Sequence, residues 1–179
     1  MIITTASLKG GVAKTTTAMH LAAYLQSKGA TLLIDGDTNR SATRWAERGL
    51  AQGGLPFKVV GVNQAARYSQ GIEHFVIDTE ASAEEEEMKE IVDGCDILVL
   101  PTTPDSLSLD ALIQTVDLLK KLKIKKYCVL LTRIHPPPRR EGEEAREFLE
   151  QQGSHCFKAK SAKRSRFKKL PIRGFLSKM

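Results

Sequence analysis

The chain has 179 residues, of which 41% are hydrophobic and 6% aromatic, and its formal net charge is +6. This size suits one globular domain with a real core, and the balance of apolar and charged residues excludes wholesale disorder. No apolar run approaches the ~20 residues of a membrane span, and no signal peptide is recognisable. Three cysteines that lie far apart exclude a disulfide framework. We therefore expect a single domain over residues 1–179 in the reducing cytoplasm.

Predicted strands and helices alternate along the chain. Several strands are near-continuous apolar runs, which is typical of a parallel sheet covered by helices on both faces. The alternation predicts a single doubly wound, mostly parallel α/β fold, which binds ligands beyond the carboxyl ends of its strands. In chain order we expect a strand at 1–7, a helix at 16–28, a strand at 31–34, a helix at 41–47, strands at 57–62 and 75–77, a helix at 83–92, a strand at 97–100 stopped by Pro101, a helix at 107–122, a strand at 127–131 and a helix at 142–152.

The segment between the first strand and the first helix has the composition of a phosphate-binding loop. Such a loop needs small residues whose backbone N–H groups wrap the phosphates, a lysine that reaches the β and γ oxygens, and a hydroxyl for Mg²⁺. The following helix adds its N-terminal dipole. The standard pattern has glycine at positions 8 and 13, where this chain has leucine and alanine. The loop instead carries a second lysine and reads Lys9-Gly10-Gly11-Val12-Ala13-Lys14-Thr15-Thr16.

Three aspartates follow predicted strands. Asp35 and Asp37 come directly after the strand at 31–34, and Asp78 comes directly after the strand at 75–77. Like the loop, they lie just after strands, where a fold of this class binds its ligands. An aspartate at a strand end is also a common cap or turn residue.

These segments together resemble the ParA/MinD family of P-loop ATPases. The family's deviant loop is K-G-G-x-x-K-T-T, as at residues 9–16, and the strands ending in D-G-D at 35–37 and in D-T at 78–79 are similar to its acidic motifs. The segment L-V-L-P-T-T-P-D-S-L-S-L at 98–109 is close to one seen in ParA-type partition proteins. The similarity covers roughly residues 1–150. It implies ATP and Mg²⁺ as cofactors, and a dimer formed around ATP.

The resemblance also assigns roles to the loop residues. Lys14 would clamp the β- and γ-phosphates, and Thr16 would hydrogen-bond the α-phosphate. Lys9 matches the family's signature lysine, which reaches across the dimer interface to the partner's nucleotide. The loop backbone would complete the nucleotide site through Gly10, Gly11, Val12, Ala13 and Thr15.

The metal, water and base contacts follow in the same way. Thr15 would ligate Mg²⁺, Asp35 and Asp78 would act there through water, and Asp37 would position the attacking water. The family's adenine-contacting asparagine after the strand at 127–131 is replaced by Thr132, so base recognition is less secure than phosphate recognition. The family's proline-containing stretch after the second acidic motif is replaced by T-E-A-S at 79–82.

The basic end of the chain is the remaining candidate site. Residues 154–179 hold nine basic residues and no acidic one, whereas residues 1–153 hold the other 18 basic residues and all 21 acidic ones, a net charge of −3. A charge run of this kind is often a solvated surface. In ParA-type relatives, however, the basic C-terminal region of the ATP-bound dimer contacts DNA without sequence preference, and such contacts weaken with salt. The candidate DNA-binding residues are Lys158, Lys160, Lys163, Arg164, Arg166, Lys168 and Lys169.

The leading hypothesis is a ParA-type ATPase that is cytoplasmic and associated with the nucleoid. It would dimerise around ATP, bind DNA nonspecifically and hydrolyse ATP when a cargo-bound protein stimulates it, so that it segregates or positions a plasmid, a chromosome or a carboxysome-like organelle. A MinD-like membrane switch is the first alternative, although Pro171 and Gly174 would interrupt an amphipathic membrane helix. A metabolic P-loop enzyme of the dethiobiotin synthetase kind is the second, against which the second lysine argues.

Overall fold

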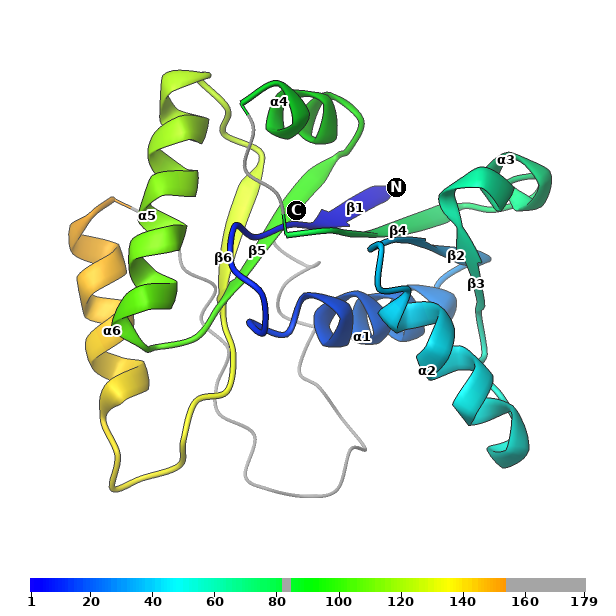
Figure 1. Cartoon of the computed structure of the whole chain (residues 1–179), viewed down its shortest axis with the longest axis horizontal. Helices are drawn as coiled ribbons and strands as arrows, with labels where there is room; N and C mark the ends of the chain where they lie inside the picture. The colour runs from blue at the N-terminus through cyan, green and yellow to red at the C-terminus, as the bar shows by residue number, and fades with distance from the viewer. Residues whose placement is uncertain (82–84, 154–179) are drawn as a thin grey trace.

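One sheet of six parallel strands forms the centre of the molecule in the order β3-β2-β4-β1-β5-β6 (Figure 1). The computed structural model describes residues 1–81 and 85–153, so the seven predicted DNA-binding residues lie outside the described residues. The sheet confirms the predicted doubly wound α/β fold. The strands are β1 (Ile2–Thr5), β2 (Thr31–Gly36), β3 (Lys58–Gly61), β4 (His74–Thr79), β5 (Ile97–Thr102) and β6 (Tyr127–Leu131).

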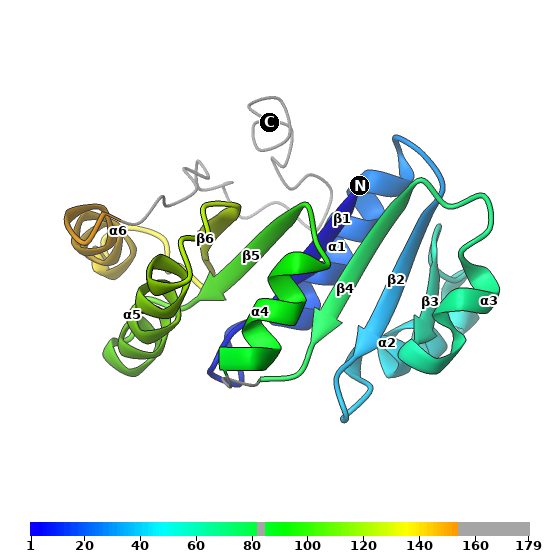
Figure 2. The same ribbon diagram turned by 90° about the horizontal axis from the view of Figure 1, so that it is seen from above.

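Helices cover both faces of this sheet. In Figure 1, α1 and α2 lie below the sheet and α3 and α4 lie above it, and Figure 2 shows the same layers from above. α5 and α6 lie beside β6, at the end of the sheet opposite β3. The helices are α1 (Lys14–Gln26), α2 (Ser41–Gly49), α3 (Ala65–Tyr68), α4 (Glu85–Asp93), α5 (Ser106–Lys121) and α6 (Glu141–Gln151), with short 3-10 turns at Leu50–Gln52 and Val62–Gln64.

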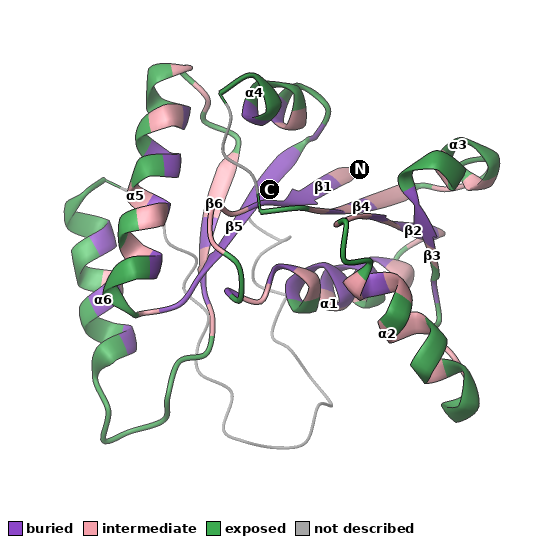
Figure 3. Cartoon of the chain, in the orientation of Figure 1, coloured by how far each residue is buried: buried purple, intermediate pink, exposed green. Residues whose placement is uncertain are grey.

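Two apolar clusters hold these layers together. The first joins α1 and α2 to β1, β2 and β4, and includes the fully buried Ile3, Leu33 and Val76. The second joins α4, α5 and α6 to β5 and β6, and includes Leu98 and Leu119. Burial is densest along the strands and on the sheet-facing sides of the helices (Figure 3). Most of the hydrophobic stabilisation therefore comes from helix-on-sheet packing.

The topology reverses at β1. This strand lies between β4 and β5, and the chain leaves it through α1 toward β2, whereas β4 continues through α4 to β5 on the other side. Two connections that depart in opposite directions make β1 the topological switch point of the sheet, and open α/β sheets bind ligands at the carboxyl ends of the strands there. The loop after β1 begins at this point, as the sequence predicted.

Several predicted boundaries were wrong, each by a few residues. Helix α1 begins at Lys14 rather than at residue 16, and β2 and β4 extend through Asp35 and Asp78. β5 also continues through the buried Pro101. The Val99 carbonyl accepts a hydrogen bond from the Ala6 N–H, so the backbone polar groups of Val99 face β1. Pro101 lies two residues further along β5, and its nitrogen therefore faces the same side. β1 has already ended there, so the N–H that proline lacks would have no partner strand. Helix α3 was not predicted because four residues carry no helical periodicity.

None of the described helices combines the length and the apolar character that crossing a membrane requires. The longest helix of the described residues is α5, which has 16 residues and carries Lys120 and Lys121 in its last turn.

Candidate nucleotide-binding site

The loop between β1 and α1 places backbone donors around an open space. Gly11 has a φ of 79° and Ala13 a φ of 71°, both left-handed, so the backbone turns sharply twice within three residues. A Cβ added at Gly10 or at Gly11 would meet no atom within 4 Å. The first turn of α1 has no side-chain cap and no acidic residue, so its N–H groups are available to an anion.

Lys14 occupies the first position of α1 and is buried. Burial lowers the pKa of Lys14, and the carboxylates of Asp78, Asp37 and Glu80 oppose this shift by favouring the charged ammonium. The lysine therefore lies among acidic groups from β4 and from the loops after β2 and β4. A buried cation at the start of a helix, beside open backbone donors, suits a polyphosphate ligand.

Asp78 is the most deeply buried carboxylate of the site. It is fully buried, and the Thr5 hydroxyl donates to its Oδ1 at 3.2 Å. Its other oxygen, Oδ2, has no hydrogen-bond partner among the described residues. Burial raises the pKa of Asp78 to about 6, against the opposing effect of the Thr15 and Thr5 hydroxyls. An unpartnered buried carboxylate oxygen indicates a missing cationic or donor ligand.

Asp35 lies opposite Asp78 in the register of β2 and β4. Both of its side-chain oxygens already accept hydrogen bonds. Oδ2 accepts from the Thr43 backbone N–H at 2.8 Å and from the Thr43 hydroxyl at 2.6 Å. Oδ1 accepts from the Asp37 backbone N–H at 3.3 Å. Asp35 therefore fixes the start of α2 and the loop before it, and any contact with a metal would run through water.

Asp37 follows β2 and is half-buried. Its Oδ1 accepts from both the backbone N–H of Asn39, at 2.9 Å, and the Asn39 side-chain amide, at 3.1 Å. The next residue, Thr38, donates its hydroxyl to Glu80 Oε1 at 2.9 Å, which joins the loop after β2 to the loop after β4. The carboxylate of Asp37 is thus held by its own loop, and its charge favours the ammonium form of Lys14.

The second lysine of the loop has a partner of its own. Lys9 Nζ lies 2.9 Å from Asp105 Oδ1 and 2.9 Å from Ser108 Oγ, at the start of α5. Hydrogen bonds from Thr103, Lys9 and Ser108 hold the pKa of Asp105 well below its usual range. Asp105 also caps α5 by accepting from the Ser108 N–H at 3.0 Å. In the single chain, Lys9 therefore points to α5.

Thr132 lies against the loop from the β6 side. Its hydroxyl oxygen is 3.0 Å from the Val12 carbonyl oxygen and 3.0 Å from the Thr102 carbonyl oxygen. A hydroxyl has one hydrogen to donate, so these two carbonyls share it. Thr132 therefore ties the phosphate loop to the end of β5, which is a positioning contact that the sequence did not reveal.

The structure brings most of the predicted site residues together. The charge of Lys14 interacts with the carboxylates of Asp37 and Asp78. The Thr15 side chain forms a hydrogen bond that lowers the pKa of Asp78. Thr16 is exposed in the first turn of α1. Sequence reasoning missed the roles of Asp105 and Glu80 as partners of Lys9 and Thr38, because contacts between residues far apart in the chain leave no local pattern.

The donor set fits magnesium. Mg²⁺ prefers hard oxygen ligands and keeps several of its waters, so it needs only one or two protein oxygens beside phosphate. Asp78 Oδ2 and the Thr15 hydroxyl can supply them, since Oδ2 is unpartnered and the Thr15 hydroxyl is close enough to Asp78 to lower its pKa. The fold and this site together define an α/β protein of the P-loop NTPase kind.

Comparison with known proteins identifies the family. Residues 3–175 match the model of the CobQ/CobB/MinD/ParA nucleotide binding domain. The chain is 39% identical over 158 residues to maintenance of carboxysome distribution protein A of Gloeobacter kilaueensis, covering 84% of this chain and 71% of the relative. The chain therefore belongs to the CobQ/CobB/MinD/ParA family, which confirms the predicted resemblance. Members of the ParA/MinD group are ATPases that include plasmid partition and carboxysome distribution proteins.

Solved structures share the fold. A plasmid partition protein from Borrelia burgdorferi superposes with a TM-score of 0.75 at 20% identity, over 99% of this chain and 98% of that chain. A variant of McdA from Cyanothece, in complex with ATP, gives a TM-score of 0.65 at 16% identity, over 87% of this chain and 81% of that chain. Both similarities concern the fold of the described sheet and helices.

Proposed function

We propose that this protein is a ParA-type ATPase that binds MgATP at the loop after β1, dimerises around it, binds DNA nonspecifically and hydrolyses ATP to position an intracellular cargo. The relative from Gloeobacter, named for carboxysome distribution, supports a carboxysome-like organelle as the cargo, alongside the plasmid or chromosome that the partition proteins suggest. A cargo-bound protein would stimulate the hydrolysis. The nucleoid would be the site of action.

Each residue of the site has a defined part in this reaction. The loop backbone and Lys14 bind the phosphates and neutralise their charge, while Thr15 and Asp78 hold the metal, with Asp35 behind them. Asp37 orients the water, since its carboxylate is already fixed by Asn39. Phosphoryl transfer depends mainly on positioning and electrostatic stabilisation, so this short list of groups is sufficient. MgATP supplies the scissile phosphate bond and the metal charge.

The observation that carries the proposal is the position of Lys9. Its ammonium lies at the exposed start of α5, where Asp105 and Ser108 hold it, and its side chain is one-third exposed. An opposing copy of the chain that brings a nucleotide to this face would offer Lys9 a stronger anion than one carboxylate. ATP occupancy and dimerisation would then be coupled through this lysine.

The test measures binding of the ATP-loaded protein to random-sequence DNA and to anionic liposomes over a salt series. The comparison variant neutralises Arg164, Arg166 and Lys168 to glutamine, and ADP-loaded protein is the nucleotide control. The proposal expects DNA binding with ATP, little with ADP, and a loss in the variant. Liposome binding without DNA binding would reject the DNA role in favour of the MinD-like alternative.

A further inference from the structure

One edge of the molecule carries positive charge that the nucleotide site does not use. Between residues 38 and 72 the chain has five basic residues and a single acidic one, Glu47, a net charge of +4, although residues 1–153 together carry −3. All five basic residues are exposed, and they come from α2 and the residue before it, from β3 and from α3. We call Arg40, Arg44, Arg48, Lys58 and Arg67 the β3-edge cluster.

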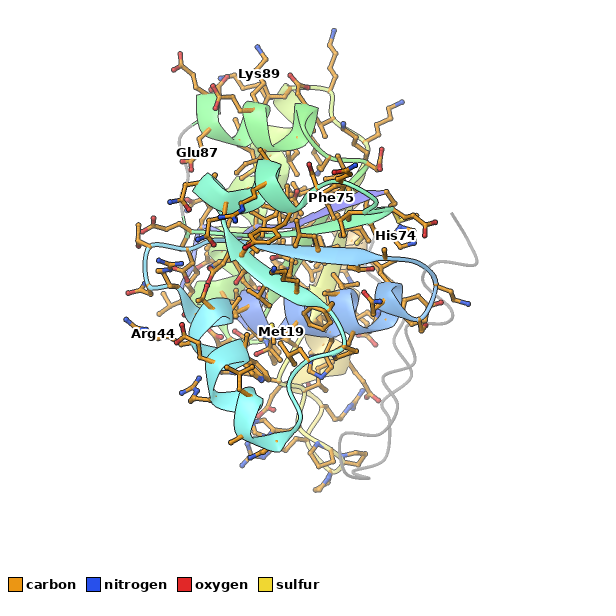
Figure 4. All side chains as sticks on the ribbon, turned by 90° about the vertical axis from the view of Figure 1, so that its right-hand side faces the viewer. Met19, Arg44, His74, Phe75, Glu87 and Lys89 are labelled. Atoms are coloured by element: carbon orange, nitrogen blue, oxygen red, sulfur yellow. The ribbon has the colours of Figure 1, made fainter. Side chains whose placement is uncertain are left out.

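Three of the four arginines of this cluster lie on α2 or directly before it. Arg44 and Arg48 are four residues apart, so they lie on the same side of the helix about 6 Å apart along its axis. Arg40 precedes the helix, and its Nη2 lies 3.4 Å from the position that a Cβ would take at Gly61, beside the end of β3. Figure 4 looks onto this edge and shows Arg44 pointing away from the sheet. Positive charge therefore runs from the end of β3 along the length of α2.

The other two cations share one aromatic ring. Lys58 Nζ lies 3.4 Å from the centroid of the Tyr68 ring, and the Arg67 guanidinium carbon lies 5.7 Å from it. Among the described residues, none of the five cations forms an ion pair with a carboxylate. Cations gathered without counter-charges repel one another, and a polyanion relieves this repulsion.

We propose that the β3-edge cluster is a contact surface for the phosphate backbone of DNA, separate from the basic residues at 158–169. This inference rests on the proposed DNA binding and adds a surface to it. Each strand of a duplex presents a phosphate about every 3.4 Å along its axis, so arginines about 6 Å apart can meet about every second phosphate. The guanidinium fork binds phosphate oxygens in pairs. A row of cations along a helix suits an extended, uniformly charged partner and carries no base readout.

The experiment compares two triple variants with the wild type. The edge variant is Arg44→Gln/Arg48→Gln/Arg67→Gln, which leaves Arg40 beside the nucleotide loops in place. The matched control is Lys89→Gln/Lys123→Gln/Lys125→Gln, which removes the same charge from exposed positions on α4 and after α5. Each protein is loaded with MgATP, and its binding to a labelled random-sequence duplex is measured by anisotropy from low to high salt. Nucleotide affinity is measured alongside, and we expect it to be unchanged.

The edge variant should bind DNA at least about 10-fold more weakly, and the slope of log K against log salt should fall by about 0.9 for each phosphate that the variant no longer neutralises. The control should stay within about 2-fold of the wild type. An edge variant that binds DNA with the wild-type affinity and salt slope overturns the inference. An edge variant that binds DNA normally but whose ATP hydrolysis is no longer stimulated by an acidic partner protein overturns it as well. If the wild type does not bind DNA at all, the proposed function fails as well. Binding that depends on residues 158–169 alone overturns only the edge surface.

Discussion

The replacement Asp78→Asn should stabilise the nucleotide-free protein while it removes a carboxylate from the proposed metal site. Asp78 is fully buried with one oxygen unpartnered, and burial raises its pKa from 3.8 to about 6. A rise of about 2 pKa units costs about 3 kcal/mol of folding free energy at a pH above both values. The asparagine amide would offset part of this gain through its own desolvation, so we expect a net increase of about 1–2 kcal/mol near pH 8.

The pH dependence of the stability difference between Asp78→Asn and the wild type tests whether the burial of a charged carboxylate causes it. The folded state holds the proton more tightly than the unfolded state, so the wild type loses stability as the pH rises from 3.8 through about 6. The advantage of Asp78→Asn should therefore shrink by about 1.4 kcal/mol between pH 8 and pH 5. Urea unfolding monitored by circular dichroism measures it, with Asp110→Asn on the exposed side of α5 as the matched control. If Asp78→Asn is less stable than the wild type at pH 8, or its effect is independent of pH, the reasoning is wrong.

Three further changes test separate contacts. Asp105→Ser keeps a cap for α5 but releases Lys9, so the ATP-bound dimer should form at a several-fold lower protein concentration in sedimentation, and an unchanged concentration would show that the pair does not restrain the lysine. Asp37→Ala should lower the ATP hydrolysis rate by about 100-fold or more and leave ATP affinity within a few-fold, which single-turnover kinetics and equilibrium binding would measure. Thr132→Val removes the hydroxyl bound to the Val12 carbonyl, so fluorescent ATP and GTP analogues should both bind several-fold more weakly. A loss confined to ATP would instead indicate a direct contact with the base.

The sequence predicts the sheet, the order of its elements and the position of the phosphate loop. This succeeds because a buried parallel strand needs a continuous apolar run and the loop needs small residues beside a lysine. The boundaries are less accurate where polar residues belong to strands. Asp35 and Asp78 continue β2 and β4, since neighbouring strands supply their backbone partners whatever the side chain.

The pairings of the site are the part that the sequence does not predict. The Lys9–Asp105 pair joins residues 96 positions apart, and the Thr38–Glu80 bond joins residues 42 positions apart. The sequence does not predict the β3-edge cluster either, because Arg44 and Arg67 lie far apart in the chain. The fold brings their helices to one edge of the sheet. Local propensity carries no information on such contacts.

The central claim is that ATP drives two copies of this chain together through Lys9. Sedimentation velocity of the wild type and of Lys9→Ala, each with MgATP and with MgADP, tests it most directly. We expect a dimer for the wild type with MgATP alone, and a monomer for Lys9→Ala with either nucleotide. A wild type that stays monomeric with MgATP, or that dimerises equally with MgADP, would contradict the account.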